Sequence, residues 1–271
     1  MDGIKVERKR KGARTIKDIP NNILEQLNKG EIETVNLAEW CAIDRKVLLS
    51  NLLKKHGRTK YLKPILRHID NLKKQTANTI NIAIGAELFE QITVNKDNDF
   101  LQIISEHQSD FVRGWAAWAI GNNTKLNIGQ MLKRIQPFSA DKHFGVREEA
   151  WCAVREKIAQ NLNDSIKILS KWVTNKDENI RRFASESTRP RGVWCEHINT
   201  LKENPELALP ILEPLKSDKA KYVQDSVGNW LNDASKSKPE FVKKLCGRWK
   251  KESDTKETKY IIKKALRTIE K

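Results

Sequence analysis

Two segments of the sequence place a carboxylate near an indole on a positively charged surface. In residues 177–194 (DENIRRFASESTRPRGVW), Glu186 is followed by Trp194, and in residues 223–233 (VQDSVGNWLND), Trp230 lies near Asp233. Carboxylates at fixed positions act as acids, bases or stabilisers of positive charge, so these are the segments where chemistry is expected. The first segment also carries four arginines, which are Arg181, Arg182, Arg189 and Arg191.

Each carboxylate also has a purely structural interpretation. Glu186 would then be a buried acid that neutralises Arg182 and Arg189 and holds the turn after it together. Asp233 would cap the segment 234–238 that follows it. The sequence leaves both interpretations open.

The two segments belong to a repeat. In each copy an aliphatic anchor, usually followed by a basic residue, precedes a small or aliphatic residue four positions later. Repeats of this length with helical periodicity are typical of stacked helix pairs. The sequence therefore predicts an all-α fold, a HEAT-like repeat α-solenoid of stacked antiparallel helix pairs with a concave basic face. The anchors recur at intervals of 34, 34, 43 and 38 residues and are Val112, Val146, Ile180, Val223 and Ile261.

An arginine follows the anchor in three repeats, at Arg113, Arg147 and Arg181. Equivalent residues of successive repeats lie side by side, so these guanidiniums would form a row that can follow phosphates. The alternative is that each arginine pairs with an acid of the adjacent repeat.

The composition favours a polyanionic partner. The chain has 51 Lys and Arg residues against 35 Asp and Glu, a formal net charge of +16. A field of this strength attracts nucleic acids or acidic membranes. The helical periodicity predicts helices that pack on one side against a core, which argues against binding to a membrane surface. No apolar run approaches the roughly 20 residues that span a bilayer. We expect a cytoplasmic protein that associates with the nucleoid.

Most of the chain after Pro20 has helical periodicity, with residues 166–173 and 207–215 as partner helices between repeats. Only residues 90–95 (EQITVN) fit a brief extended piece. We expect a flexible basic arm over residues 1–20 and a single repeat domain over residues 21–271. Within the arm, the residues expected to contact a nucleic-acid backbone are Lys9, Arg10 and Lys11. The expected helix caps are Ser109, Asp141 and Asp177.

No cofactor or metal is expected. The four cysteines and five histidines show neither a CxxC nor an HxxxH pair, whereas zinc sites need closely spaced ligands.

Two long motifs resemble one known family. The family is that of the HEAT-like repeat DNA glycosylases, the AlkC and AlkD superfamily of DNA alkylation repair proteins. Residues 185–194 (SESTRPRGVW) are similar to the Ser-Glu-Gly-x-Arg-Pro-Arg-x-x-Trp signature of its AlkC branch. Residues 222–233 (YVQDSVGNWLND) resemble a run in the next repeat of the AlkC branch, which is the closer one. The resemblance covers roughly residues 105–250.

The resemblance implies a monomer that wraps double-stranded DNA, damaged or branched, and excises cationic N-alkylpurines such as 3-methyladenine or 7-methylguanine. Such bases are already good leaving groups, so the enzyme needs carboxylates to stabilise an oxocarbenium-like sugar and to orient water. By position these carboxylates would be Glu186 and Asp233, and Trp194 would contact the base. The arginines expected at the DNA backbone are Arg113, Arg147, Arg181, Arg182, Arg189 and Arg191.

One position departs from the family pattern. Where AlkC-like proteins carry a Glu-Phe-x-Val-Arg segment, this chain has His143 in place of the glutamate. An imidazole does not stabilise a cationic sugar as a carboxylate does. Glu148 is close in sequence but lies on a different helix face, and with His143 and Trp230 it forms a second tier of candidates. Three functions therefore stay open: an N-glycosylase, a non-catalytic binder of duplex or branched DNA, and a HEAT scaffold for a protein partner.

Overall fold

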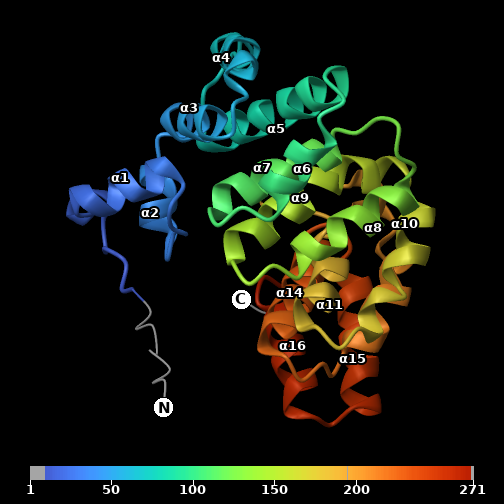
Figure 1. Cartoon of the computed structure of the whole chain (residues 1–271). Helices are drawn as coiled ribbons and strands as arrows, with labels where there is room; N and C mark the ends of the chain where they lie inside the picture. The colour runs from blue at the N-terminus through green and yellow to red at the C-terminus, as the bar shows by residue number, and fades with distance from the viewer. Residues whose placement is uncertain (1–9, 194, 270–271) are drawn as a thin grey trace, which may run out of the picture. The chain divides into compact units, whose positions relative to one another are not determined.

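A computed structural model describes residues 10–193 and 195–269 of the chain (Figure 1). In these residues the structure has sixteen α-helices, five short 3-10 helices and no strand, which confirms the all-α prediction. The chain forms two compact units, residues 1–119 and 120–271. The prediction of a single repeat domain over residues 21–271 stays a prediction.

The first unit is built from short helices joined by tight turns. Helix α1 ends at Lys29 because Gly30 adopts a left-handed conformation (φ 70°) that favours glycine. Side chains at the residue before the first turn cap several of the others, as Asn36 does for α2 and Asp97 for α6. The helices are α1 (Asn21–Lys29), α2 (Leu37–Ala42), α3 (Arg45–Lys55), α4 (Leu62–Asp70), α5 (Ala77–Val94), α6 (Asn98–Ser105) and α7 (Asp110–Gly121), which continues into the second unit.

The expected extended piece at residues 90–95 is wrong, because residues up to Val94 complete helix α5. The β-branched residues Ile92, Thr93 and Val94 lower helix propensity only slightly. Ile92 is buried while Val94 is exposed, so the burial follows a helix and not a strand.

The second unit contains the two motifs. Helix α14 packs against both α11 and α16, and α15 packs against α16 across the connection Ser253–Thr255 (Figure 1). The helices are α8 (Ile128–Ser139), α9 (Phe144–Gln160), α10 (Leu162–Leu169), α11 (Glu178–Glu186), α12 (Asn199–Glu203), α13 (Leu209–Leu212), α14 (Lys221–Ser235), α15 (Pro239–Glu252) and α16 (Lys256–Leu266).

The partner helix expected over residues 207–215 is broken into pieces. Proline has no N–H and clashes with the preceding turn of a helix. Pro210 is the second residue of α13, and Pro214 lies in the 3-10 helix Glu213–Leu215 that follows it. The other expected partner, residues 166–173, is divided between α10 and the 3-10 helix Trp172–Thr174.

The repeat prediction is confirmed by burial. All five anchors lie in helices α7, α9, α11, α14 and α16 and are buried, and the small or aliphatic residues four positions later are fully buried. An anchor and the residue four positions later share a helix face, and this face packs against the rest of the unit. The small residues let helices approach closely: a Cβ added to Gly121 in α7 would overlap the Ala153 carbonyl of α9.

Candidate functional site

Three helices of the second unit bring carboxylates and guanidiniums into one alternating network. Helix α9 contributes Glu148, α11 contributes Arg182 and Glu186, and α14 contributes Asp233. Arg189, in the turn after α11, lies between the last two carboxylates. The order along the network is therefore acid, base, acid, base, acid, and every member touches a partner of opposite charge.

Glu186 is held by three groups at the end of α11. Its Oε1 accepts a hydrogen bond from Arg189 Nη1 at 2.8 Å, and its Oε2 accepts one from Ser226 Oγ at 2.7 Å. Arg182 Nη2, one helical turn earlier, lies 3.7 Å from Oε2. The four-residue spacing places Arg182 on the side of α11 that carries Glu186, and Arg189 contacts the same carboxylate from the turn after the helix.

Asp233 closes the network near the end of α14. Its Oδ2 accepts hydrogen bonds from Arg189 Nε at 2.8 Å and lies 2.7 Å from Arg189 Nη2. Lys236 Nζ lies 3.4 Å from Oδ1. A single guanidinium therefore joins Asp233 to Glu186, and both carboxylates keep a fixed position.

Electrostatics keep Glu186 ionised. Burial alone would raise the pKa of Glu186, but the charges of Arg182 and Arg189 outweigh it, and the net effect lowers the pKa. Burial likewise lowers the pKa of each arginine, but the neighbouring carboxylates reverse that effect, so both pKa values rise. Glu186 and the two arginines that surround it are therefore charged at neutral pH.

Glu148 is the exposed carboxylate of this network. Its side chain is 41% exposed, against 6% for Glu186 and 5% for Asp233. Arg182 Nη2 donates to Glu148 Oε1 at 2.8 Å, and Trp151 Nε1 donates to Oε2 at 2.8 Å. Glu148 was expected on a different helix face, but it still belongs to the same network as Glu186. The long side chain of Arg182 contacts both carboxylates.

Tyr222 is a functional candidate that the sequence analysis missed. The Arg182 guanidinium lies 4.1 Å from the centre of its ring, and that of Arg147 lies 5.3 Å away. Its hydroxyl donates to Glu148 Oε1 at 3.4 Å, and burial raises its pKa. The available signal was its place directly before the anchor Val223, where a second tyrosine, Tyr260, precedes the anchor Ile261.

The arginines that follow the anchors each bind the turn before their own helix. Each donates its Nη1 to the backbone carbonyls six and five residues earlier, which lie in the turn before its own helix. Gln224 occupies the same place in the next repeat and does the same with its amide. The distances range from 2.6 to 3.3 Å, and the residues concerned are Arg113, Arg147, Arg181 and Gln224.

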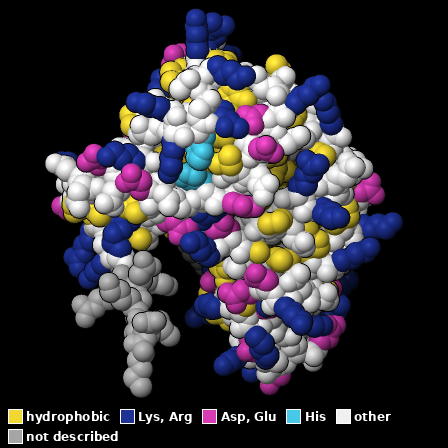
Figure 2. Space-filling model, viewed as in Figure 1, with side chains coloured by type: hydrophobic (Ala, Val, Ile, Leu, Met, Phe, Trp, Pro, Cys, Tyr) yellow, Lys and Arg dark blue, Asp and Glu magenta, His cyan; other side chains and the backbone are white. Residues whose placement is uncertain are grey.

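Two of these arginines also pair with acids, as the structural alternative stated. Arg113 contacts Glu33 at 2.5 Å, and Arg181 contacts both carboxylate oxygens of Asp218 at 2.6 and 3.0 Å. A phosphate would therefore compete with intramolecular partners at these positions. Arg191 donates to Ser237 Oγ at 2.8 Å. Lys and Arg side chains are spread over the visible face, with acidic side chains among them (Figure 2).

His143 is the N-cap of α9. Its Nδ1 accepts from the Gly145 N–H at 3.1 Å, and its ring lies 4.7 Å from that of Phe144. The cap expected at Asp141 is therefore wrong by two residues: the Asp141 carboxylate accepts from the backbone N–H of His143 instead. The helix needs an acceptor at this position, and this need accounts for a polar residue there.

Trp230 is fully buried, and its Nε1 donates to the Thr188 carbonyl at 3.0 Å. It packs in the core and is not placed to contact a ligand. Trp194 lies outside the described residues. The turn on either side of it is held by Arg155, a buried arginine missed in the sequence, whose guanidinium donates to the carbonyls of Ser187, Arg189 and Glu196.

Part of the predicted basic arm is anchored to the first unit. Arg10 bonds both carboxylate oxygens of Glu39, at 2.5 and 2.8 Å, and the Glu33 carbonyl at 2.9 Å. Lys11 is exposed. Lys9 and the rest of residues 1–9 lie outside the described residues, so the flexible arm stays a prediction.

Within the described ranges, no group of three His, Cys, Asp or Glu side chains is placed to hold a metal ion. The same ranges contain no helix that is both long and apolar enough to cross a membrane.

Comparison with known proteins identifies the part of the chain that holds the network. The model of the DNA alkylation repair enzyme family matches residues 146–269, which include every member of the network. This match covers a little under half of the chain. The chain is also 41% identical over 117 residues to the uncharacterized protein YhaZ of Bacillus subtilis (strain 168). The match covers 43% of this chain and 32% of YhaZ, so the chain spans about a third of that relative.

Two solved structures share the fold. The alkylpurine DNA glycosylase AlkC of Pseudomonas fluorescens, bound to DNA containing an abasic site analog, superposes with a TM-score of 0.66 at 20% identity, over 96% of this chain and 66% of that one. AlkD2 of Streptococcus mutans superposes with a TM-score of 0.56 at 23% identity, over 76% of this chain and 97% of AlkD2. The similarity to AlkC extends beyond the residues that match the family model.

Proposed function

We propose that the chain is a monofunctional DNA glycosylase that excises cationic N-alkylpurines from duplex DNA. The family match over residues 146–269 and the shared fold with an alkylpurine DNA glycosylase support this proposal. The net charge of +16 suits a DNA partner. We further propose that it acts as a monomer on nucleoid DNA in the cytoplasm.

The observation that carries the proposal is the set of three carboxylates held within one network. A cationic N-alkylpurine leaves without prior protonation, and the positive charge that develops on the sugar is stabilised by fixed negative groups. Glu148 faces solvent and can approach a bound sugar directly. Glu186 and Asp233 stay proposed catalytic carboxylates, but bound DNA must displace the Arg189 guanidinium before either one meets the sugar.

The pairing of Glu186 and Asp233 with Arg189 also favours a second function, that of a non-catalytic DNA binder. A buried carboxylate that is neutralised by arginine acts as a structural tie. In that case the fold would hold DNA without cleaving the glycosidic bond.

Base release from duplex DNA that contains 3-methyladenine and 7-methylguanine separates these functions. Wild-type protein should release both bases, and Asp233→Asn should lose release but keep its affinity for the same duplex. Steeply salt-dependent binding without release would overturn the glycosylase proposal in favour of the DNA binder. Binding that is weak and insensitive to salt would overturn both.

A further inference from the structure

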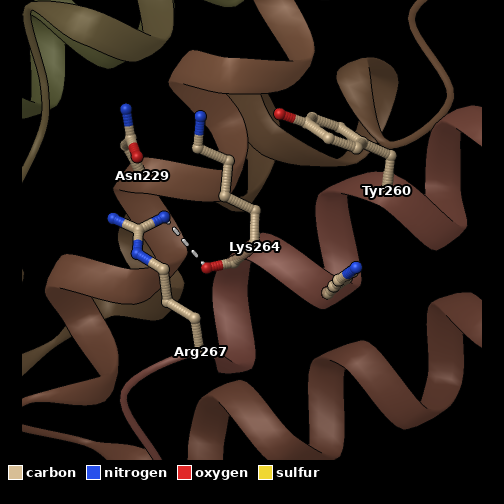
Figure 3. A pocket seen from close by; sticks show the side chains of 5 residues that line it. Asn229, Tyr260, Lys264 and Arg267 are labelled. Carbon is tan, nitrogen blue, oxygen red and sulfur yellow. Dashed lines mark hydrogen bonds between the residues drawn. The ribbon is translucent and has the colours of Figure 1, made fainter.

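A shallow pocket of about 410 Å³ lies between α14 and α16, and no member of the carboxylate network lines it. Its lining combines three cationic side chains, one amide and one aromatic ring, and no acidic side chain takes part. Figure 3 labels Asn229 on α14, Tyr260 and Lys264 on α16, and Arg267 directly after α16. The lining residues are Asn229, Tyr260, Lys263, Lys264 and Arg267.

The charge of this pocket is only partly compensated. Lys264 Nζ contacts Asp225 Oδ1 at 2.5 Å, and the Tyr260 hydroxyl donates to the same oxygen at 2.6 Å. Among the residues that the structure describes, neither Lys263 nor Arg267 has a carboxylate within 4.0 Å. Arg267 donates to the Lys264 carbonyl at 3.1 Å, and its side chain is exposed (Figure 3). Two exposed cations without a carboxylate partner among the described residues favour an anionic oxygen ligand.

The repeat register aligns this pocket with the network. Lys263 lies two residues after its anchor, as Asp225, Arg182 and Glu148 do in the preceding repeats. Equivalent positions of stacked repeats follow one another along the same face. The row therefore runs from the exposed Glu148 through α11 and α14 to Lys263 on α16.

A second contact repeats in the same way. Tyr222, directly before its anchor, reaches back to the preceding repeat, where the Arg182 guanidinium lies on its ring. Tyr260, at the equivalent place, reaches back to Asp225 of the repeat before it. The tyrosines thus occupy corresponding positions in successive repeats, and Tyr260 lines the pocket.

We propose that this pocket binds a backbone phosphodiester of the DNA whose damaged nucleotide faces the carboxylate network. The exposed carboxylate of Glu148 repels phosphates, so the backbone that enters or leaves the network needs cations farther along the row to hold it. Lys263 and Arg267 supply them on the same row. The inference rests on DNA as the partner in the proposed function, but not on base excision.

The test compares two double variants that each lose two positive charges. The pocket variant, Lys263→Ala/Arg267→Ala, removes the two cations of the pocket that have no carboxylate partner. The control variant, Lys250→Ala/Lys251→Ala, removes two exposed lysines of α15 that do not line the pocket. Fluorescence anisotropy of a labelled duplex is measured over a range of salt concentrations. We expect the pocket variant to bind about tenfold more weakly with a salt slope shallower by about one or two, and the α15 variant to match wild type.

Equal slopes for the two variants and wild type would overturn the inference and leave the proposed function standing. A wild-type protein that binds no duplex would overturn the proposed function as well. A second measurement uses inorganic phosphate and follows the Tm of wild type and of the pocket variant. If phosphate raises only the Tm of wild type, while both proteins bind DNA equally, the pocket binds a free phosphate and the phosphodiester proposal is wrong. Unchanged circular dichroism shows that the variants fold.

Discussion

Glu186 and Asp233 are joined by a single guanidinium. Arg189 donates from Nη1 to Glu186 and contacts Asp233 through Nε and Nη2, all between 2.7 and 2.8 Å. The two carboxylates come from different helices, α11 and α14, and both are nearly inaccessible to solvent. Arg189 therefore links two repeats, and it also holds the two negative charges of Glu186 and Asp233 in fixed positions.

Loss of this guanidinium should destabilise the fold strongly. Arg189→Ala leaves two buried carboxylates without their main cationic partner, which costs about 3–5 kcal/mol of the free energy of unfolding. Urea denaturation followed by circular dichroism measures it. Arg134→Ala, which removes an exposed arginine of α8, should change the free energy by less than about 0.5 kcal/mol. Similar values for both variants would show that the tie contributes nothing.

Low pH should reduce the contribution of Glu186 to the free energy of unfolding. Burial raises its pKa, but Arg182 and Arg189 reverse the effect and bring the pKa below its ordinary value of 4.5. A group with a lowered folded-state pKa stabilises fully above its unfolded pKa, and this stabilisation is lost as the pH falls through the folded pKa. The stability difference between wild type and Glu186→Gln should therefore be constant from about pH 7 to 5 and shrink below about pH 4.5. A difference that grows in acid would contradict the charged network.

The arginines that follow the anchors should contribute to the stability of the fold and not to DNA affinity. Arg181→Ala removes two bonds to its preceding turn and the pairing with Asp218, whose carboxylate is nearly buried. We expect a loss of about 3 kcal/mol in the free energy of unfolding. The salt slope of duplex binding should stay unchanged. An intact stability with a slope shallower by about one would instead assign Arg181 to a phosphate. Lys176→Ala, an exposed neighbour in the same turn, is the control.

The repeat architecture could be predicted because each repeat carries its own signal. Val146 and Ala150 lie four residues apart in one repeat, and Val223 and Val227 do so in another, so the shared buried faces follow from sequence spacing alone. The positions of Glu186 and Asp233 could be predicted from the resemblance to known motifs. Their common partner, Arg189, was in the same motif but had been assigned to the DNA backbone.

The parts that could not be predicted depend on contacts between repeats. Tyr222 and Glu148 are far apart in sequence and meet only because α9, α11 and α14 stack. The role of Arg155 likewise depends on the turn that folds back over it. Helical spacing gives the face of a residue within its own helix but not the reach of a long side chain such as Arg182 across to the next one.

If the network excises bases, loss of its exposed carboxylate, Glu148, should slow excision. Single-turnover release of 3-methyladenine is measured for wild type, Glu148→Gln and Glu156→Gln, which alters an exposed glutamate on the same helix. We expect Glu148→Gln to slow release about 100-fold while duplex affinity and stability stay near wild type, and Glu156→Gln to match wild type. Equal rates for all three proteins, or no release by wild type, would contradict base excision by this network.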